Sequence, residues 1–142
     1  MSGPAVRAHV AALMERLHDD TTEFFTGLDR GGQFHEDRWD RPGGGGGVAR
    51  VLSEGTTFEK AGINRSAVSG VLPASAAQRL GARVTGTEEL QFYATGMSLV
   101  IHPRSPMVPT VHLNIRYFDL TSLSGETLDA MRRSGVIRRS FS

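Results

Sequence analysis

The segment Thr110-Val111-His112-Leu113-Asn114-Ile115-Arg116-Tyr117 alternates apolar and polar residues along its length. Successive side chains of a β-strand point to opposite faces of the sheet, so the polar residues share one face. That face carries a titratable donor, an amide and a permanent cation: His112, Asn114 and Arg116. The opposite face is predicted to enter a core and carries Val111, Leu113, Ile115 and Tyr117. Antiparallel sheets commonly leave one side to water, so an ordinary solvated face is the alternative interpretation.

The preceding segment, Gly96-Met97-Ser98-Leu99-Val100-Ile101-His102, shows the same alternation. A short proline-rich link at residues 103–109 joins the two segments, which predicts an antiparallel hairpin. In such a hairpin, Ser98 and His102 can lie beside His112 and Arg116. This combination suits the binding of carboxylates and the transfer of protons.

Around this hairpin, the pattern predicts a helix at residues 4–29, where apolar residues recur at helical spacing and Arg7 can occupy the exposed face. Further strands are expected at residues 34–38, 48–52, 66–72, 90–102 and 110–120, with a helical turn at 74–80. The glycines at 43–47 are expected to break the strand pattern, either as a flexible turn or as backbone that approaches a ligand closely. Ser124 can start a short helix to about Arg133, and residues 136–142 read as a frayed tail. Together these elements predict an α+β fold with a largely antiparallel sheet flanked by helices.

Composition excludes several classes of function. The 142 residues carry a net charge of +1, which gives no global case for nucleic acid or an anionic membrane as partner. The absence of cysteine excludes disulfides and thiolate chemistry and agrees with a cytoplasmic location. No stretch approaches the roughly 20 apolar residues of a membrane span, and the first residues do not form a signal peptide.

Specific catalytic patterns are weak. His102 and His112 could bind a metal together, but a catalytic zinc site usually needs a third protein ligand and no HExxH occurs. Ser98 lies in no GxSxG sequence, which argues against a serine hydrolase. The glycine run is not followed by GK[ST], so it is not a Walker loop. The segment at residues 58–64 is uninformative when taken alone.

Taken together, several segments resemble the oxygen-dependent coproporphyrinogen-III oxidases. The resemblance extends from about Asp29 to Phe118, and its motifs are long and occur in the family's order. They are Trp39-Asp40-Arg41 with the glycine run and Arg50-Val51, residues 58–66 (FEKAGINRS), 70–73 (GVLP), 94–106 (ATGMSLVIHPRSP) and 107–118 (MVPTVHLNIRYF).

The resemblance implies a reaction and a set of roles. The family converts two propionates of coproporphyrinogen III to vinyl groups with dioxygen, giving protoporphyrinogen IX, without an organic cofactor and as a homodimer. His112 matches the proposed catalytic proton donor, and His102 and His112 match proposed ligands of a disputed divalent metal. Substrate contacts are implied for Ser98, Asn114, Ile115 and Arg116.

The resemblance also predicts how the chain is organised. Residues 1–118 match the N-terminal part of the family's domain, so the fold is expected to be incomplete, and residues 119–142 form a divergent tail. Asp119-Leu120-Thr121 resembles part of a later family block that carries a substrate-binding aspartate. We therefore expect weak tetrapyrrole binding, slow or absent turnover, and self-association through an uncovered apolar face. The alternatives are a non-catalytic remnant that binds porphyrinogen or a full-length homologue, and a small module that binds an anionic ligand at His112 and Arg116.

Overall fold

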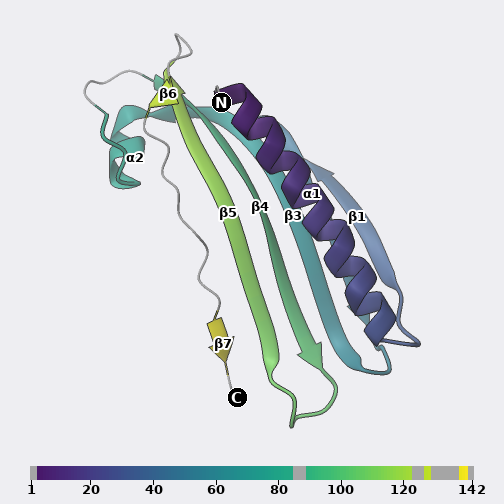
Figure 1. Ribbon diagram of the computed structural model, residues 1–142. Helices are drawn as coiled ribbons and strands as arrows, with labels where there is room; N and C mark the ends of the chain where they lie inside the picture. Colours follow the sequence, from purple (N-terminus) through teal and green to yellow (C-terminus); the bar gives the residue numbers. More distant parts are fainter. Residues whose placement is uncertain (1–2, 85–88, 123–126, 129–137, 141–142) are drawn as a thin grey trace.

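A computed structural model describes residues 3–84, 89–122, 127–128 and 138–140. It consists of a twisted antiparallel sheet with one long helix, α1, lying across one face (Figure 1). The elements in chain order are α1 (Gly3–Leu28), β1 (Phe34–Asp40), β2 (Gly45–Ser53), β3 (Phe58–Pro73), α2 (Ala74–Arg79), β4 (Glu89–Pro103), β5 (Thr110–Ser122), β6 (Thr127–Leu128) and β7 (Arg138–Ser140).

The strands follow one another in space in the order of the sequence. Within the described residues the sheet order is β1-β2-β3-β4-β5-β6, and β7 pairs with β5 near Thr110. Every neighbouring pair is antiparallel, because each strand is joined to the next by a connection short enough to return beside it. The predicted α+β fold with a largely antiparallel sheet is therefore confirmed.

The main core lies between α1 and the sheet. Met14 of α1 packs on the inward-facing residues of three central strands, all of them almost fully buried: Leu52, Ala61, Ile63, Met97, Leu99 and Ile101. His18 of α1 is also fully buried, and its Nε2 donates to the carbonyl oxygen of Ile63 at 3.0 Å. Burial lowers the pKa of His18, which favours the neutral imidazole in this core.

A buried carboxylate fixes the C-terminal end of α1. Asp29 accepts hydrogen bonds from the backbone N–H groups of Thr56, Thr57 and Phe58 at 2.8–3.0 Å. These donors belong to the turn between β2 and β3 and the start of β3, so one side chain joins the helix end to the sheet. Backbone donors buried without a partner are costly, which explains why an acid occupies this position.

Ion pairs connect charged residues along the sides of α1 to the sheet. Arg50 of β2 binds Asp19 at 2.8 Å, and Arg65 of β3 binds Glu15 at 3.0 Å. Arg7, expected on the exposed face, instead pairs with the buried carboxylate of Asp119 in β5. That expectation was wrong because periodicity within a helix does not reveal a charged partner on a distant strand.

Two sequence predictions need correction in the strands. The glycine run breaks the strand pattern only in part: Gly43 and Gly44 belong to the turn between β1 and β2, but β2 already begins at Gly45, where a positive φ of 87° favours glycine. The segment that was uninformative alone, residues 58–64, is the first half of the long strand β3. Its apolar residues alternate only over a short stretch, so the pattern was too brief to indicate a strand.

The predicted helix from Ser124 to about Arg133 lies mostly outside the described residues. Its described part, Thr127–Leu128, forms β6 and pairs with Leu120 and Thr121, so the helix is wrong there. The tail at residues 136–142 also lies partly outside the described residues. Its described part, Arg138–Ser140, pairs with β5 as β7 and is not frayed.

Candidate functional site

The site lies on the sheet face opposite α1, called here the open face. Register places Ser98 of β4 beside Asn114 of β5, Gly96 beside Arg116, and Val100 beside His112. Because alternate residues of each strand share a face, the polar residues predicted from the sequence come together on this side. Leu113 and Ile115 pack against the α1 core on the other side, as predicted.

Two predicted residues behave differently from the rest. The side chain of Ile115 belongs to the core, so any contact it makes on the open face must come from its backbone. Val111, expected with the buried set, is 44% exposed. It lies near the start of β5, in the stretch of the strand that pairs with β7.

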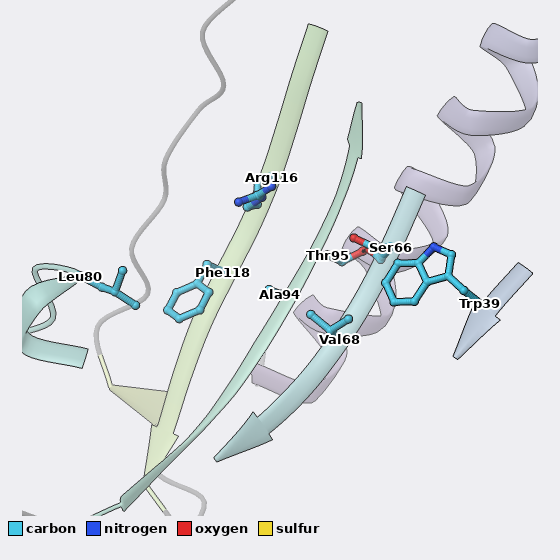
Figure 2. Close-up of a pocket in the computed structure, with 8 residues that line it drawn as sticks. All are labelled: Trp39, Ser66, Val68, Leu80, Ala94, Thr95, Arg116 and Phe118. Carbon is cyan, nitrogen blue, oxygen red and sulfur yellow. Dashed lines mark hydrogen bonds between the residues drawn. The ribbon is translucent and has the colours of Figure 1, made fainter. Parts of the chain in front are cut away.

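The open face holds two adjoining cavities. The larger has a volume of about 500 Å³ and combines apolar with polar lining (Figure 2). The smaller has about 150 Å³, and its lining residues include the polar Asn64, Ser98 and Asn114. Trp39, Ser66 and Arg116 line both, so the two form one continuous depression across the sheet. The larger volume lies within the range of small-molecule sites.

The short helix α2 walls one end of the depression. Leu80, just beyond α2, lines the larger cavity together with Phe118 of β5. Ala77 of α2 packs in a second core with Leu90 and Leu120, and this core closes the open face at that end. The depression thus has an apolar end at α2 and a polar end toward Ser98 and Asn114.

Arg116 supplies the positive charge of the site. Among the described residues its guanidinium forms no hydrogen bond or ion pair, whereas Arg7, Arg50 and Arg65 each bind a carboxylate. A guanidinium can bind a carboxylate through two parallel hydrogen bonds. The arrangement can therefore accept an anion without first breaking an internal ion pair.

His102 and His112 lie on the open face beyond Ser98 and Asn114, and neither is among the residues that line the two cavities. Their ring centroids are 6.0 Å apart in an edge-to-face arrangement. In the part of the chain that the structure describes, no group of three or more His, Cys, Asp or Glu side chains could hold a metal ion. Two imidazoles alone do not fit the three protein ligands of a catalytic zinc site, so we assign no chemical step to a metal.

Two residues of the depression do not follow from the pattern of any single strand. Trp39 and Ser66 come from β1 and β3, and their place beside Arg116 depends on strand order rather than on local pattern. Asp119 does not line the site, because its side chain points toward α1 and is completely buried there. In the sequence, only its place next to the glycine-rich motif marks Trp39. The alternation of residues along a strand does not reveal that it lines the depression.

These features define a class: an α+β protein whose antiparallel sheet carries a helix on one face and an arginine- and histidine-bearing depression on the other. The chain matches the coproporphyrinogen III oxidase family over residues 9–133. It therefore belongs to the coproporphyrinogen III oxidase family.

Similar proteins come from distant organisms. The chain is 52% identical over 99 residues to the oxygen-dependent coproporphyrinogen-III oxidase of Drosophila melanogaster, covering 68% of this chain and 25% of that protein. Identity is 42% over 120 residues with coproporphyrinogen-III oxidase 1, chloroplastic, of Arabidopsis thaliana, covering 83% and 31%. It is 43% over 115 residues with the oxygen-dependent coproporphyrinogen-III oxidase of Prochlorococcus marinus, covering 80% and 32%.

The chain thus spans about a quarter to a third of the length of these relatives. The part that matches the family, residues 9–133, contains both strands of the Ser98–Arg116 hairpin. Within the described residues, no helix combines the length and the apolar character that a membrane span requires.

Proposed function

We propose that this chain binds coproporphyrinogen III in the open-face depression and takes part in its oxidative decarboxylation to protoporphyrinogen IX. The observation that carries the proposal is the guanidinium of Arg116, which has no partner among the described residues and lies beside Ser98 and Asn114 at a cavity of about 500 Å³. The proposed substrate presents four propionate carboxylates around an apolar ring. The depression offers the matching combination of a cation, hydrogen-bonding groups and an apolar wall.

The reaction balances with dioxygen as the electron acceptor. Each of the two propionates that react loses its carboxyl group as carbon dioxide and a hydrogen from the carbon next to the pyrrole, leaving a vinyl group. The two electrons released pass to dioxygen, which with two protons becomes hydrogen peroxide. No organic cofactor enters the proposal, because dioxygen takes the electrons directly from the substrate.

Individual roles follow from chemistry and position. Arg116 binds a propionate through charge-assisted hydrogen bonds, and Asn114 and Ser98 supply neutral hydrogen-bonding groups beside it. His112 is the residue for proton transfer, since imidazole is the side chain that gains and loses a proton near neutral pH. Ile115 contributes through its backbone only.

Two further features belong to the proposal. The protein works as a homodimer, which the edge strand β1 supports, because among the described residues its outer edge pairs with no other strand and leaves surface for a second copy. It is placed in the cytoplasm, and the lack of cysteine supports a reducing compartment. Two of the relatives described above are not named for any compartment, whereas the Arabidopsis protein is named as chloroplastic.

Turnover is tested directly. Coproporphyrinogen III is prepared without oxygen and mixed with the protein, oxygen is admitted, and protoporphyrin is measured by fluorescence after chemical oxidation. Product formation that is lost in His112→Ala, while that variant still binds substrate, supports the enzymatic role. Failure of the wild-type protein to bind coproporphyrinogen III rejects the proposal.

A second candidate is a binding protein without turnover. The observation that favours it is the orientation of Asp119, which binds Arg7 on the α1 side and does not face Arg116. In this case the protein holds porphyrinogen, or a full-length homologue, without oxidising it. Binding that depends on Arg116, with no product after oxygen is admitted, distinguishes this function from the first.

A further inference from the structure

Trp39 occupies an unusual position for the only tryptophan of the chain. It lies on the edge strand β1, where its side chain is 43% exposed and faces the depression. Its indole covers Gly47 of β2: a Cβ at Gly47 would lie 2.5 Å from Cζ2 and 2.6 Å from Cε2 of Trp39. Glycine at position 47 therefore lets the ring lie flat against the sheet.

Strand register puts Trp39 and Arg116 in one row. Trp39 pairs with Gly47, Gly47 with Ser66, Ser66 with Gly96, and Gly96 with Arg116. Four inter-strand steps of about 4.8 Å place the two end residues about 19 Å apart along the sheet. The three residues between them, Gly47, Ser66 and Gly96, are all small, so large side chains stand only at the two ends of the row.

We infer that Trp39 and Arg116 are the two ends of one binding row, in which Trp39 packs against the tetrapyrrole ring while Arg116 holds a propionate. This inference rests on the proposed function and adds a residue that determines specificity. The indole provides a broad apolar surface with an N–H at its edge, which suits an aromatic pyrrole unit. Arg116 alone recognises any carboxylate, whereas the pair selects a carboxylate carried by a large ring.

The distance between Trp39 and Arg116 explains why both residues are needed for ring binding. A ligand that reaches only Arg116 gains the charged contact but leaves the Trp39 end of the floor in water. A ring wide enough to reach from the indole across Ser66 and Gly96 to Arg116 also removes the exposed surface of Trp39 from water. Replacement of the indole by an aliphatic side chain is expected to weaken ring binding about five- to tenfold, as for loss of an aromatic contact.

The test measures binding of coproporphyrinogen III to the whole chain by equilibrium dialysis without oxygen. Ligand on each side of the membrane is quantified as fluorescent coproporphyrin after oxidation. The variants are Trp39→Leu, Trp39→Phe and Arg116→Ala. Phe24→Leu is the matched control, since Phe24 is an exposed aromatic residue of α1 and α1 covers the opposite face of the sheet. Circular dichroism verifies that each variant is folded.

The salt dependence of coproporphyrinogen binding distinguishes the contribution of Trp39 from that of Arg116. Trp39→Leu is expected to bind about five- to tenfold more weakly with unchanged salt dependence, and Trp39→Phe to retain most of the affinity. Arg116→Ala is expected to bind more weakly and to lose most of the salt dependence, because a charged contact is screened by salt. In the wild-type protein, the emission of Trp39 should move to shorter wavelength on binding, since the ligand removes water from the indole.

Each result bears on a distinct claim. Wild-type affinity in Trp39→Leu, together with weakened binding in Arg116→Ala, overturns the role of Trp39 and leaves the proposed function standing. Equal weakening in Trp39→Leu and Phe24→Leu also overturns it, because the effect is then not local to the row. Absence of any binding by the wild-type protein overturns the proposed function and this inference with it.

Discussion

The carboxylate of Asp119 binds Arg7 across the sheet–helix interface, with Nε of Arg7 2.8 Å from Oδ2. Tyr117 donates its hydroxyl to the same oxygen at 2.9 Å. The hydrogen bond to Asp119 raises the pKa of Arg7 above its ordinary value. The pair fastens the N-terminal half of α1 to β5, on the side of the sheet away from Arg116. Asp119 thus stabilises the fold and does not line the open face.

Replacement of Asp119 is expected to cost stability rather than binding. Asp119→Asn leaves Arg7 and Tyr117 with a weaker, uncharged acceptor and should lower the free energy of unfolding by about 1–3 kcal/mol. Urea denaturation measures this loss, with Asp20→Asn on the exposed face of α1 as control. Unchanged stability combined with lost coproporphyrinogen binding would place Asp119 in the site and contradict the structure.

A second prediction concerns acid stability. Burial by itself raises the pKa of Asp29, but hydrogen bonds from backbone N–H groups outweigh it and hold the pKa well below its ordinary value. Those donors include Phe58, Thr56, Gly32 and Thr57. A depressed folded-state pKa stabilises the protein above the unfolded-state pKa of about 3.9, and this contribution is lost as the pH falls below that value.

Asp29→Asn removes this titration. The variant should be less stable at pH 7 by about 2–3 kcal/mol, because an amide is a weaker acceptor for the same donors. Between about pH 5 and pH 2.5 the wild-type protein should lose more stability than the variant, because the unfolded wild-type chain takes up a proton at position 29 in this range while folded Asp29 stays ionised. Denaturation at several pH values compares the two slopes, and equal slopes would refute the role given to Asp29.

Arg116 is expected to affect binding without affecting the fold. Its guanidinium has no ion pair among the described residues, so Arg116→Ala should change the free energy of unfolding by less than about 0.5 kcal/mol. Loss of a charge-assisted hydrogen bond should weaken coproporphyrinogen binding at least about tenfold. Arg116→Lys should recover part of this loss, because lysine keeps the charge but not the bidentate geometry. A variant that unfolds, or that binds like the wild type, would contradict the assignment.

The histidine pair makes a prediction about metals. Dialysis against a chelator should leave both coproporphyrinogen affinity and thermal stability unchanged, since the described residues offer two imidazoles and no third ligand. Added zinc should bind weakly, and His102→Ala should remove that binding. A chelator-dependent loss of affinity, restored by one particular metal, would contradict this prediction.

Self-association remains a prediction of the exposed surface. Met107 at the tip of the β4–β5 hairpin is 88% exposed, and Val108 and Val111 near it are about half exposed. An apolar cluster on a hairpin favours association, and so does the outer edge of β1, which pairs with no strand in the part of the chain that the structure describes. Sedimentation at micromolar concentration should show oligomers of the wild type and fewer of Met107→Glu. A compact monomer at all concentrations would contradict both this prediction and the proposed homodimer.

Local pattern was sufficient for much of the architecture. The alternation at Thr110–Tyr117 and at Gly96–His102 predicted two strands, their hairpin and the faces of their side chains. The helical spacing of apolar residues predicted α1. These inferences succeed because side-chain direction within a strand or helix is fixed by backbone geometry, which residue order alone reveals.

Other features needed information from distant segments. The first half of β3 was missed, because its burial depends on α1 and on the neighbouring strands. The described part of the expected helix after Ser124 proved to be β6, since pairing with β5 overrode local preference. Arg7 and Asp29 appeared to be ordinary helix-surface and helix-end residues, and only their partners more than 25 positions away reveal their roles.

The sequence by itself determined the family, the strand hairpin and the polar set Ser98, Asn114 and Arg116, because all of these are encoded in continuous motifs. Only the tertiary structure decided that Trp39 and Ser66 line the same depression and that Asp119 does not. The physical reason is that strand order and register bring together residues from β1, β3 and β5 that are separated by dozens of positions in the chain. Residues that lie side by side across neighbouring strands show no regular spacing in the sequence, whereas residues on one face of a single strand recur at every second position.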